Sequence, residues 1–216
     1  MALTIAVSNL KGGVGKSTLS LNLATCLHRA GHRVLIVDAD PQATCRTWSA
    51  KAAELGHDGP PVVGIEGRSL RKDLARVSAG FEVVVIDSPP RMGVEARAAM
   101  LASDLVALPV TPGAADIWAL QETLNVLDEA RQVRPELRGV VILNRADRTT
   151  LAKLARHAIG ELDVEILEAT IATRVAFGEA TLAGQGVVDY APDSEAAREV
   201  RRMTKALLGA MEAVAA

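Results

Sequence analysis

The sequence has very few aromatic residues and no excess of positive charge. Aromatic side chains make up 2% of its 216 residues, whereas hydrophobic residues make up 49%, so the core must be built from aliphatic side chains. That composition is typical of a parallel sheet covered by helices, whose strands are unbroken aliphatic runs. A formal net charge of −2 excludes a globally basic nucleic-acid binder but is compatible with a local basic patch.

Cysteine is also scarce. Cys26 and Cys45 are far apart and lack metal-ligand spacing, which excludes a disulfide framework and indicates no zinc or iron–sulfur site. We interpret Cys26 as a small core residue. The scarcity of cysteine also indicates a protein of a reducing, cytoplasmic compartment. The apolar runs are all shorter than the roughly 18 residues that span a bilayer, so no stable membrane insertion is expected.

Short aliphatic runs alternate with segments of helical periodicity. The runs predicted to be strands are Leu3–Val7, Val34–Val37, Val83–Ile86, Leu105–Val110 and Val140–Leu143. The predicted helices are Lys16–Ala30, Thr44–Leu55, Val94–Leu101, Ile117–Val133, Leu151–Leu162 and Ser194–Val214. This alternation predicts an α/β fold of three layers, a mostly parallel twisted sheet with helices on both faces. We expect one domain over residues 1–216, with Leu55–Gly67 as an elaborated loop.

The most informative segment lies between the first predicted strand and helix, where glycines precede a lysine and a serine. Glycines let the backbone curl so that its N–H groups point toward phosphate oxygens, and the helix N-terminus favours an anion. Lys16 is expected to reach the β- and γ-phosphates, and the Ser17 hydroxyl to ligate Mg²⁺. The segment predicts a phosphate-binding P-loop of Lys11, Gly12, Gly13, Val14, Gly15, Lys16, Ser17 and Thr18.

This P-loop departs from the general pattern, and its departure resembles a known family. The general motif has a glycine where this chain has Leu10, and here an extra lysine, Lys11, stands at the head of the loop. In this respect the chain is similar to the deviant Walker A ATPases, which include ParA, MinD and the nitrogenase iron protein. The resemblance implies binding of ATP with Mg²⁺ and an ATP-dependent homodimer, in which Lys11 crosses the interface to the partner's nucleotide.

Two acidic segments fit the same resemblance. The segment from Asp38 to Gln42 resembles the family's switch, which implies that Asp40 positions the attacking water. Asp87 ends an aliphatic strand and resembles a Walker B carboxylate, which can belong to the switch and hold Mg²⁺ through water. Phosphoryl transfer needs mainly positioning and charge neutralisation, so the expected catalytic residues are Lys11, Lys16 and Asp40. Since no arginine finger in cis is identified, we expect slow basal hydrolysis and a stimulating partner.

Later segments also resemble ParA. The stretch Pro109–Ala119 resembles a ParA segment near the base and the dimer interface, and Asp116 is expected to cap the following helix. Asn144 occupies the position where the family reads adenine, although a turn-forming asparagine is the plainer alternative. Thr170–Tyr190 resembles the ParA carboxyl-terminal region, so the likeness covers nearly the whole chain. The residues expected to serve in packing are Trp48, Trp118, Met203 and Met211.

The members of this family differ in function. The two cysteines cannot supply the cluster of a nitrogenase iron protein. MinD-like members end in an amphipathic membrane helix, but the charges of Ser194–Val214 balance, so we predict that this helix packs on the body of the protein. A strand-like segment begins at Leu3, so no amino-terminal helix-turn-helix domain is expected. The chain most resembles short ParA or ParF-type partition ATPases, which implies a cytoplasmic, nucleoid-associated bacterial protein.

ParA-like members bind DNA non-specifically as ATP-bound dimers until a ParB-like or cargo-adaptor protein stimulates hydrolysis. Such binding needs only lysine and arginine at phosphate spacing, although any one of them can equally be ordinary solvated charge. The candidates are Arg145, Arg148, Lys153, Arg156, Arg174, Arg201 and Arg202. We therefore predict an ATPase that segregates or positions a plasmid, chromosome region or protein cluster. The alternatives are a MinD-like membrane-associated ATPase and a nucleotide-switched regulatory binding module.

Overall fold

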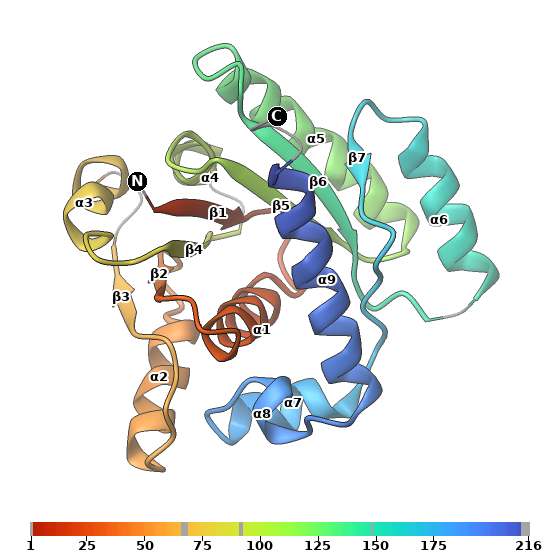
Figure 1. Cartoon of the computed structure of the whole chain (residues 1–216). Helices are drawn as coiled ribbons and strands as arrows, with labels where there is room; N and C mark the ends of the chain where they lie inside the picture. The colour runs from red at the N-terminus through yellow and green to blue at the C-terminus, as the bar shows by residue number, and fades with distance from the viewer. Residues whose placement is uncertain (1, 66–68, 91–92, 148, 213–216) are drawn as a thin grey trace.

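A computed structural model describes residues 2–65, 69–90, 93–147 and 149–212. In these residues a seven-stranded sheet has the order β3-β2-β4-β1-β5-β6-β7 (Figure 1), and each strand pair is parallel. The strands are β1 (Leu3–Val7), β2 (Val34–Asp38), β3 (Val62–Gly64), β4 (Val83–Asp87), β5 (Leu105–Val110), β6 (Arg138–Leu143) and β7 (Glu165–Ile166). The predicted parallel α/β fold is confirmed.

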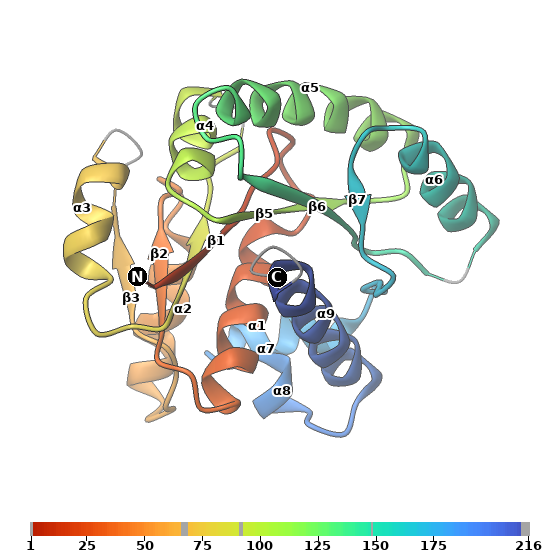
Figure 2. The same ribbon diagram turned by 45° about the horizontal axis from the view of Figure 1, so that its top comes forward.

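Helices cover both faces of the sheet (Figure 2). One face carries α1 (Lys16–Arg29), α2 (Thr44–Glu54), α7 (Val175–Leu182), α8 (Val187–Tyr190) and α9 (Glu195–Glu212). The other carries α3 (Leu70–Val77), α4 (Gly93–Leu101), α5 (Ala114–Arg131) and α6 (Thr150–Gly160). Because successive strand side chains point to opposite faces, Ile5 and Val7 pack with the α1 layer and Ala6 packs with the α3 layer.

The final helix packs on the body of the protein, as predicted. Val200, Met203 and Leu207 recur every three or four residues along α9, are fully buried, and belong to the same core cluster as α1. Burial of each such side chain stabilises the fold by roughly 1.5–3 kcal/mol. Across the described parts of the chain, no helix combines the length and the apolarity needed to cross a bilayer.

The structure differs from the sequence predictions at several places. The predicted loop Leu55–Gly67 contains β3, an edge strand of three residues that is too short to form a recognisable aliphatic run. Asp116 does not cap α5, because the helix begins at Ala114 after Gly113 and the Asp116 amide already donates to the Gly113 carbonyl. The elements β7, α3, α7 and α8 have eight residues or fewer and were not predicted. The single-domain assignment stays a prediction.

The register of the central strands positions the functional site. Val7 of β1 lies beside Asp87 of β4, and Asp87 lies beside Asp38 of β2. The three loops that follow these strands therefore start at one level of the same sheet edge. In an open parallel sheet this carboxyl edge is where ligands bind.

Candidate functional site

The segment between β1 and α1, residues 8–15, has a backbone that requires glycine. Gly13 and Gly15 have φ angles of 79° and 95°, in the left-handed region that L side chains rarely adopt. A Cβ on Gly15 would also lie 2.3 Å from Nδ2 of Asn144. Lys16 is 6% exposed, and its Nζ donates to the Lys11 carbonyl at 2.9 Å, so its ammonium lies inside the loop.

Two side chains that the sequence analysis missed hold the head of this loop. Asn9 Oδ1 accepts from the Lys11 amide at 2.9 Å and from Thr123 Oγ1 at 3.1 Å, and Asn9 Nδ2 donates to the Pro109 carbonyl at 2.8 Å. Thr123 Oγ1 also accepts from the Leu10 amide at 3.2 Å. Asn9 and Thr123 are fully buried, so β5 and α5 fix the start of the loop from behind. Thr123 is 114 residues from Asn9 and carries no local sequence signal.

The extra lysine has a partner within its own chain. The Lys11 ammonium forms an ion pair with Asp116 in the first turn of α5, and Asp116 also accepts a hydrogen bond from the Thr111 hydroxyl. The carboxylate of Asp116 thus neutralises Lys11 in the single chain. The expected contact of Lys11 with a partner's nucleotide stays a prediction, and it requires Lys11 to leave Asp116.

Asp87 lies fully buried at the centre of the site. Its Oδ1 accepts from Ser20 Oγ at 3.1 Å, its Oδ2 accepts from Cys45 Sγ at 3.4 Å, and the Ser17 hydroxyl also hydrogen-bonds to it. Burial raises the pKa of Asp87 to about 6, an effect opposed by these hydrogen bonds and reinforced by the charge of Asp38. Burial and neighbouring carboxylates, chiefly Asp87, hold the pKa of the Cys45 thiol above its ordinary value.

The predicted switch segment is tied to itself by hydrogen bonds. Asp38 Oδ1 accepts from the Asp40 amide at 3.2 Å, and Asp38 Oδ2 accepts from the Arg46 amide at 2.9 Å. Asp40 Oδ1 accepts from the Gln42 amide at 3.0 Å. Burial lowers the pKa of Lys16, and the negative charges of Asp87 and Asp40 oppose this. The fold therefore brings Lys16 together with carboxylates from two neighbouring strand ends.

Asn144 also belongs to this site. It is buried after β6, and its Nδ2 donates to the Val14 carbonyl of the P-loop at 2.7 Å. This amide supports the loop directly, while its expected contact with adenine stays a prediction. Arg145 follows with a φ of 51°, in the left-handed region, and lies in the segment after the carboxyl end of β6.

The predicted basic cluster after β6 consists of Arg145, Arg148, Lys153 and Arg156, and only some of these side chains are free of polar contacts among the described residues. The side chains of Arg145 and Lys153 are exposed and have no hydrogen bond or ion pair within the described part of the chain. Arg156 donates through Nη2 to the carbonyls of Leu167 and Glu168 at 3.0 and 3.3 Å, so it supports the segment after β7. Arg148 lies outside the described residues.

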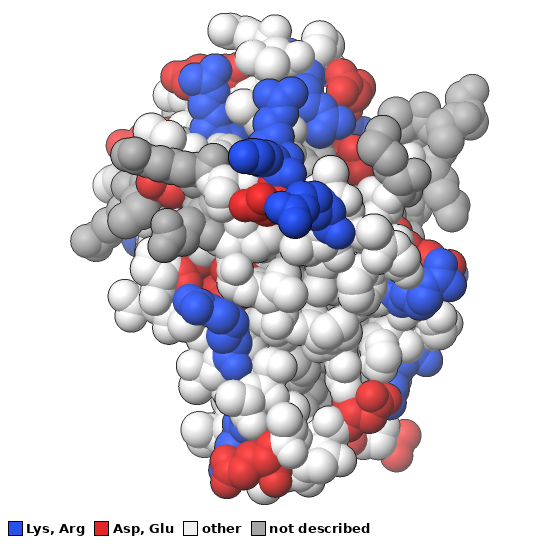
Figure 3. Space-filling model, turned by 90° about the vertical axis from the view of Figure 1, so that its left-hand side faces the viewer, with Lys and Arg blue, Asp and Glu red and all other residues white. Residues whose placement is uncertain are grey.

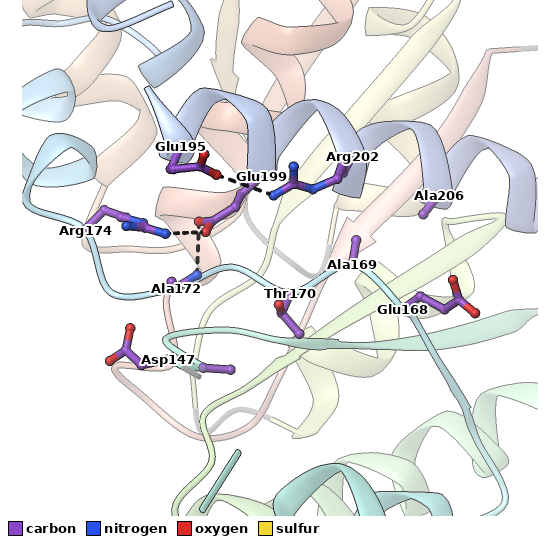
Figure 4. Close-up of a pocket in the computed structure, with 11 residues that line it drawn as sticks. Asp147, Glu168, Ala169, Thr170, Ala172, Arg174, Glu195, Glu199, Arg202 and Ala206 are labelled. Atoms are coloured by element: carbon purple, nitrogen blue, oxygen red, sulfur yellow. Dashed lines mark hydrogen bonds and ion pairs between the residues drawn. The ribbon is translucent and has the colours of Figure 1, made fainter. Parts of the chain in front are cut away.

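The predicted extension of that cluster lines a cavity of mixed charge. The cavity, of about 860 Å³, lies between α9 and the segments after β6 and β7 (Figure 4). Arg174 Nη2 lies 2.7 Å from Glu199 Oε1, and Arg202 Nη2 lies 3.9 Å from Glu195 Oε2 (Figure 4). Arg201 donates to the Pro192 carbonyl at 2.8 Å. These guanidinium groups therefore have internal acceptors that a phosphate would have to replace.

Three cations on α3 were not predicted as candidates. Arg71, Lys72 and Arg76 are exposed and lack a partner among the described residues, and Lys and Arg side chains gather on this side of the molecule (Figure 3). Arg71 lines a cavity with Thr4 and Glu82, at the amino ends of β1 and β4. Arg76 lines another cavity with Gly64, at the carboxyl end of β3, so this surface lies at the β3 side of the sheet, away from β6.

The expectation that Trp118 is a packing residue was wrong. Trp118 is 74% exposed, because it lies on the face of α5 opposite the buried Leu120 and Leu127, whereas Trp48 and Met203 are buried as predicted and Met211 is half-buried. Val94, in the first turn of α4, is 70% exposed. Both residues lie near helix starts at the carboxyl edge of the sheet, the edge that carries the P-loop.

Residues 5–187 match the family model of the CobQ/CobB/MinD/ParA nucleotide binding domain. The chain is 34% identical to the maintenance of carboxysome distribution protein A of Gloeobacter kilaueensis, over 94% of this chain and 93% of that one. It is 29% identical to the chromosome-partitioning ATPase Soj of Thermus thermophilus, over 96% of each chain. The septum site-determining protein MinD of Pyrococcus horikoshii, solved with Mg-ADP, shares the fold with a TM-score of 0.77, 23% identity and 96% coverage of both chains.

Asp87→Asn is expected to stabilise the nucleotide-free protein at pH 8. The folded state binds the Asp87 proton more tightly than the unfolded chain, so stability from this group is lost as the pH rises from 3.8 to about 6. We expect the substitution to raise the free energy of unfolding by roughly 1–3 kcal/mol at pH 8, and the gain to shrink toward pH 4. Urea unfolding at both pH values measures this.

Asp128→Asn on the exposed face of α5 is the matched control, and its effect should be small at both pH values. A loss of stability for Asp87→Asn at pH 8, or a gain that does not depend on pH, would show that ionised Asp87 does not cost the fold stability.

Proposed function

We propose that this chain, which belongs to the CobQ/CobB/MinD/ParA nucleotide-binding family, is a ParA-type ATPase that positions a plasmid, chromosome region or protein cluster. The observation that carries the proposal is the buried Lys16 ammonium inside a glycine loop, beside the buried Asp87 carboxylate. Two relatives support this choice of output, since one is named for carboxysome distribution and the other for chromosome partitioning.

The residues of the loop fit a nucleotide phosphate chain with Mg²⁺. A Cβ on Gly13 would meet nothing within 4 Å, so there is open space beside a backbone whose left-handed turn suits inward N–H groups. The Ser17 hydroxyl and the Asp87 carboxylate hydrogen-bond to each other, and such oxygen donors suit Mg²⁺. The MinD structure with Mg-ADP supports the choice of an adenine nucleotide and magnesium.

Each residue then has a distinct task. Bound Mg-ATP supplies the phosphoanhydride bond that is cleaved. Lys16 neutralises charge on the phosphate oxygens, Ser17 ligates the metal, and Asp87 holds it through water. Asp40 orients the attacking water from a loop whose backbone Asp38 ties in place. Asn144 holds Val14 of the loop and would lie next to the base.

We predict that the purified protein hydrolyses ATP slowly by itself. Lys11 is paired with Asp116 in the single chain, so an additional cation reaches the phosphates only after dimerisation or partner binding. A cation of that kind, such as an arginine finger, contributes roughly 10³–10⁵ in rate. Phosphate release at saturating Mg-ATP measures the basal rate, with Asp40→Ala as the blank. A turnover of about 1–100 s⁻¹, the range of kinases, for the chain alone would contradict the prediction.

The exposed pair Arg145 and Lys153 is the proposed DNA contact. Arg145 directly follows Asn144, which touches the P-loop, so a change at the nucleotide can reach it. Wild-type protein should bind non-specific duplex with a Kd on the order of 10⁻⁴–10⁻⁶ M in ATP, but not without nucleotide or in ADP. Arg145→Glu with Lys153→Glu should weaken this binding at least about tenfold. The slope of the logarithm of the binding constant against the logarithm of the salt concentration should become shallower by about two.

Fluorescence anisotropy with no nucleotide, ADP, ATP and a non-hydrolysable analogue measures this binding. Arg71→Glu with Lys72→Glu is the matched control, because it makes the same charge change on α3, which packs beside β2 and β4 and away from β6 and Arg145. Full binding by the Arg145 and Lys153 variant would refute the assignment. Binding to anionic vesicles instead of DNA would favour the MinD-like alternative. An Asp40→Ala protein that still distributes its cargo in cells would favour the alternative of a nucleotide-switched regulatory binding module, because such a module does not depend on hydrolysis.

Trp118→Ser is expected to weaken the ATP-dependent dimer at least about tenfold, because a buried tryptophan often dominates an interface. Trp118 lies at the edge that carries Lys11, where the proposed dimer would cover it. Sedimentation with the non-hydrolysable analogue measures the dimer. Val133→Ser, another exposed apolar residue just beyond the far end of α5, is the control. Equal dimerisation of wild type and Trp118→Ser would place the interface elsewhere.

A further inference from the structure

Cys45 lies inside the nucleotide site, which its position in the sequence did not indicate. It occupies the first turn of α2 and is fully buried, and its Sγ is 3.4 Å from Oδ2 of Asp87. We propose that Cys45 is a positioning residue, whose thiol donates to Asp87 and fixes the direction in which this carboxylate faces the metal. The inference rests on the proposed function only in taking Asp87 as the carboxylate that faces Mg²⁺.

The donors to Asp87 come from two helices. Ser20 of α1 donates to Oδ1, and Ser17 of the same helix also bonds to the carboxylate. Cys45 of α2 donates to Oδ2. The terminal torsion of an aspartate is broad and roughly two-fold, so donors from one helix alone leave the plane of the carboxylate less well defined. Cys45, a donor to Oδ2 from another helix, restricts the range of that torsion.

The position of Cys45 depends on the switch segment. Ala43, just before α2, has a φ of 57° in the left-handed region, and the Arg46 amide in the same turn as Cys45 is held by Asp38. A movement of the segment from Asp38 to Ala43 would therefore shift the thiol relative to Asp87. The Ala39 amide already ties the switch to the backbone of Asp87 by donating to its carbonyl at 3.0 Å, and Cys45 adds a contact from the end of the switch to the Asp87 carboxylate.

The S–H stretching band in the infrared tests the contact without any nucleotide. Cys26→Ala leaves Cys45 as the one thiol of the chain, and its band should lie below that of a free thiol because the S–H group donates. Adding Asp87→Asn should move the band upward, since a neutral amide oxygen is a weaker acceptor than a carboxylate. A band at the free-thiol position, or one that Asp87→Asn does not move, would overturn the proposal.

The magnesium dependence of nucleotide binding tests the positioning role. A fluorescent ATP analogue is titrated at several Mg²⁺ concentrations into wild type, Cys45→Ala, Cys45→Ser and Cys26→Ala. Cys45→Ala should raise the Mg²⁺ concentration for half-saturation at least about threefold, with unchanged binding in the absence of Mg²⁺, because it removes the donor. Cys45→Ser keeps a donor, so its Mg²⁺ concentration for half-saturation should lie close to that of the wild type.

Cys26→Ala is the matched control, because Cys26 is on α1, half-buried against the core, and is not among the residues that contact Asp87. Its Mg²⁺ dependence should equal that of the wild type. Wild-type Mg²⁺ dependence in Cys45→Ala would overturn the positioning role. Absence of nucleotide binding in the wild type itself would instead overturn the proposed function, while the infrared band would still decide whether Cys45 donates to Asp87.

Discussion

The parallel pairing of β4 with both β1 and β2 is the constraint on which the nucleotide site depends. Val7, Asp87 and Asp38 lie side by side in register across the three strands. A slip of one residue would turn Asp87 toward the other face of the sheet, since side chains alternate along a strand. The aliphatic strands β1, β2 and β4, buried throughout except for Leu3 at the start of β1, hold this register and so hold the P-loop, the switch and Asp87 together.

The electrostatics of the site follow from that burial. Asp38, Asp40 and Asp87 are all buried, the charges of Asp40 and Asp87 act on the Lys16 ammonium, and the pKa of Asp87 is raised because its charge is poorly solvated. A divalent cation would relieve this concentration of negative charge. Part of the free energy of Mg-nucleotide binding would then appear as stability of the fold, since a ligand that binds only the folded state stabilises it.

The proposed output depends on features that share one edge of the sheet. Lys11 with Asp116, the exposed Trp118, and Arg145 beside Asn144 all lie where the P-loop lies. A nucleotide bound at this edge can change the dimer surface and the DNA contact together, because short contacts connect them. The cations of α3 lie beside β2 and β4, away from β6, and their side chains have no partner among the described residues that connects them to the loop.

The sequence by itself determined the P-loop, the strand and helix pattern, and the order of the acidic motifs, because these depend on local properties. Glycine at residues 13 and 15 answers a local backbone requirement, and aliphatic runs and helical periodicity are visible within short windows. Only the tertiary structure decided the contacts between distant residues, such as Thr123 with Asn9 and Cys45 with Asp87, 114 and 42 residues apart. It also decided which arginines are free, because Arg174 and Arg156 find acceptors on elements that come together only in the folded chain.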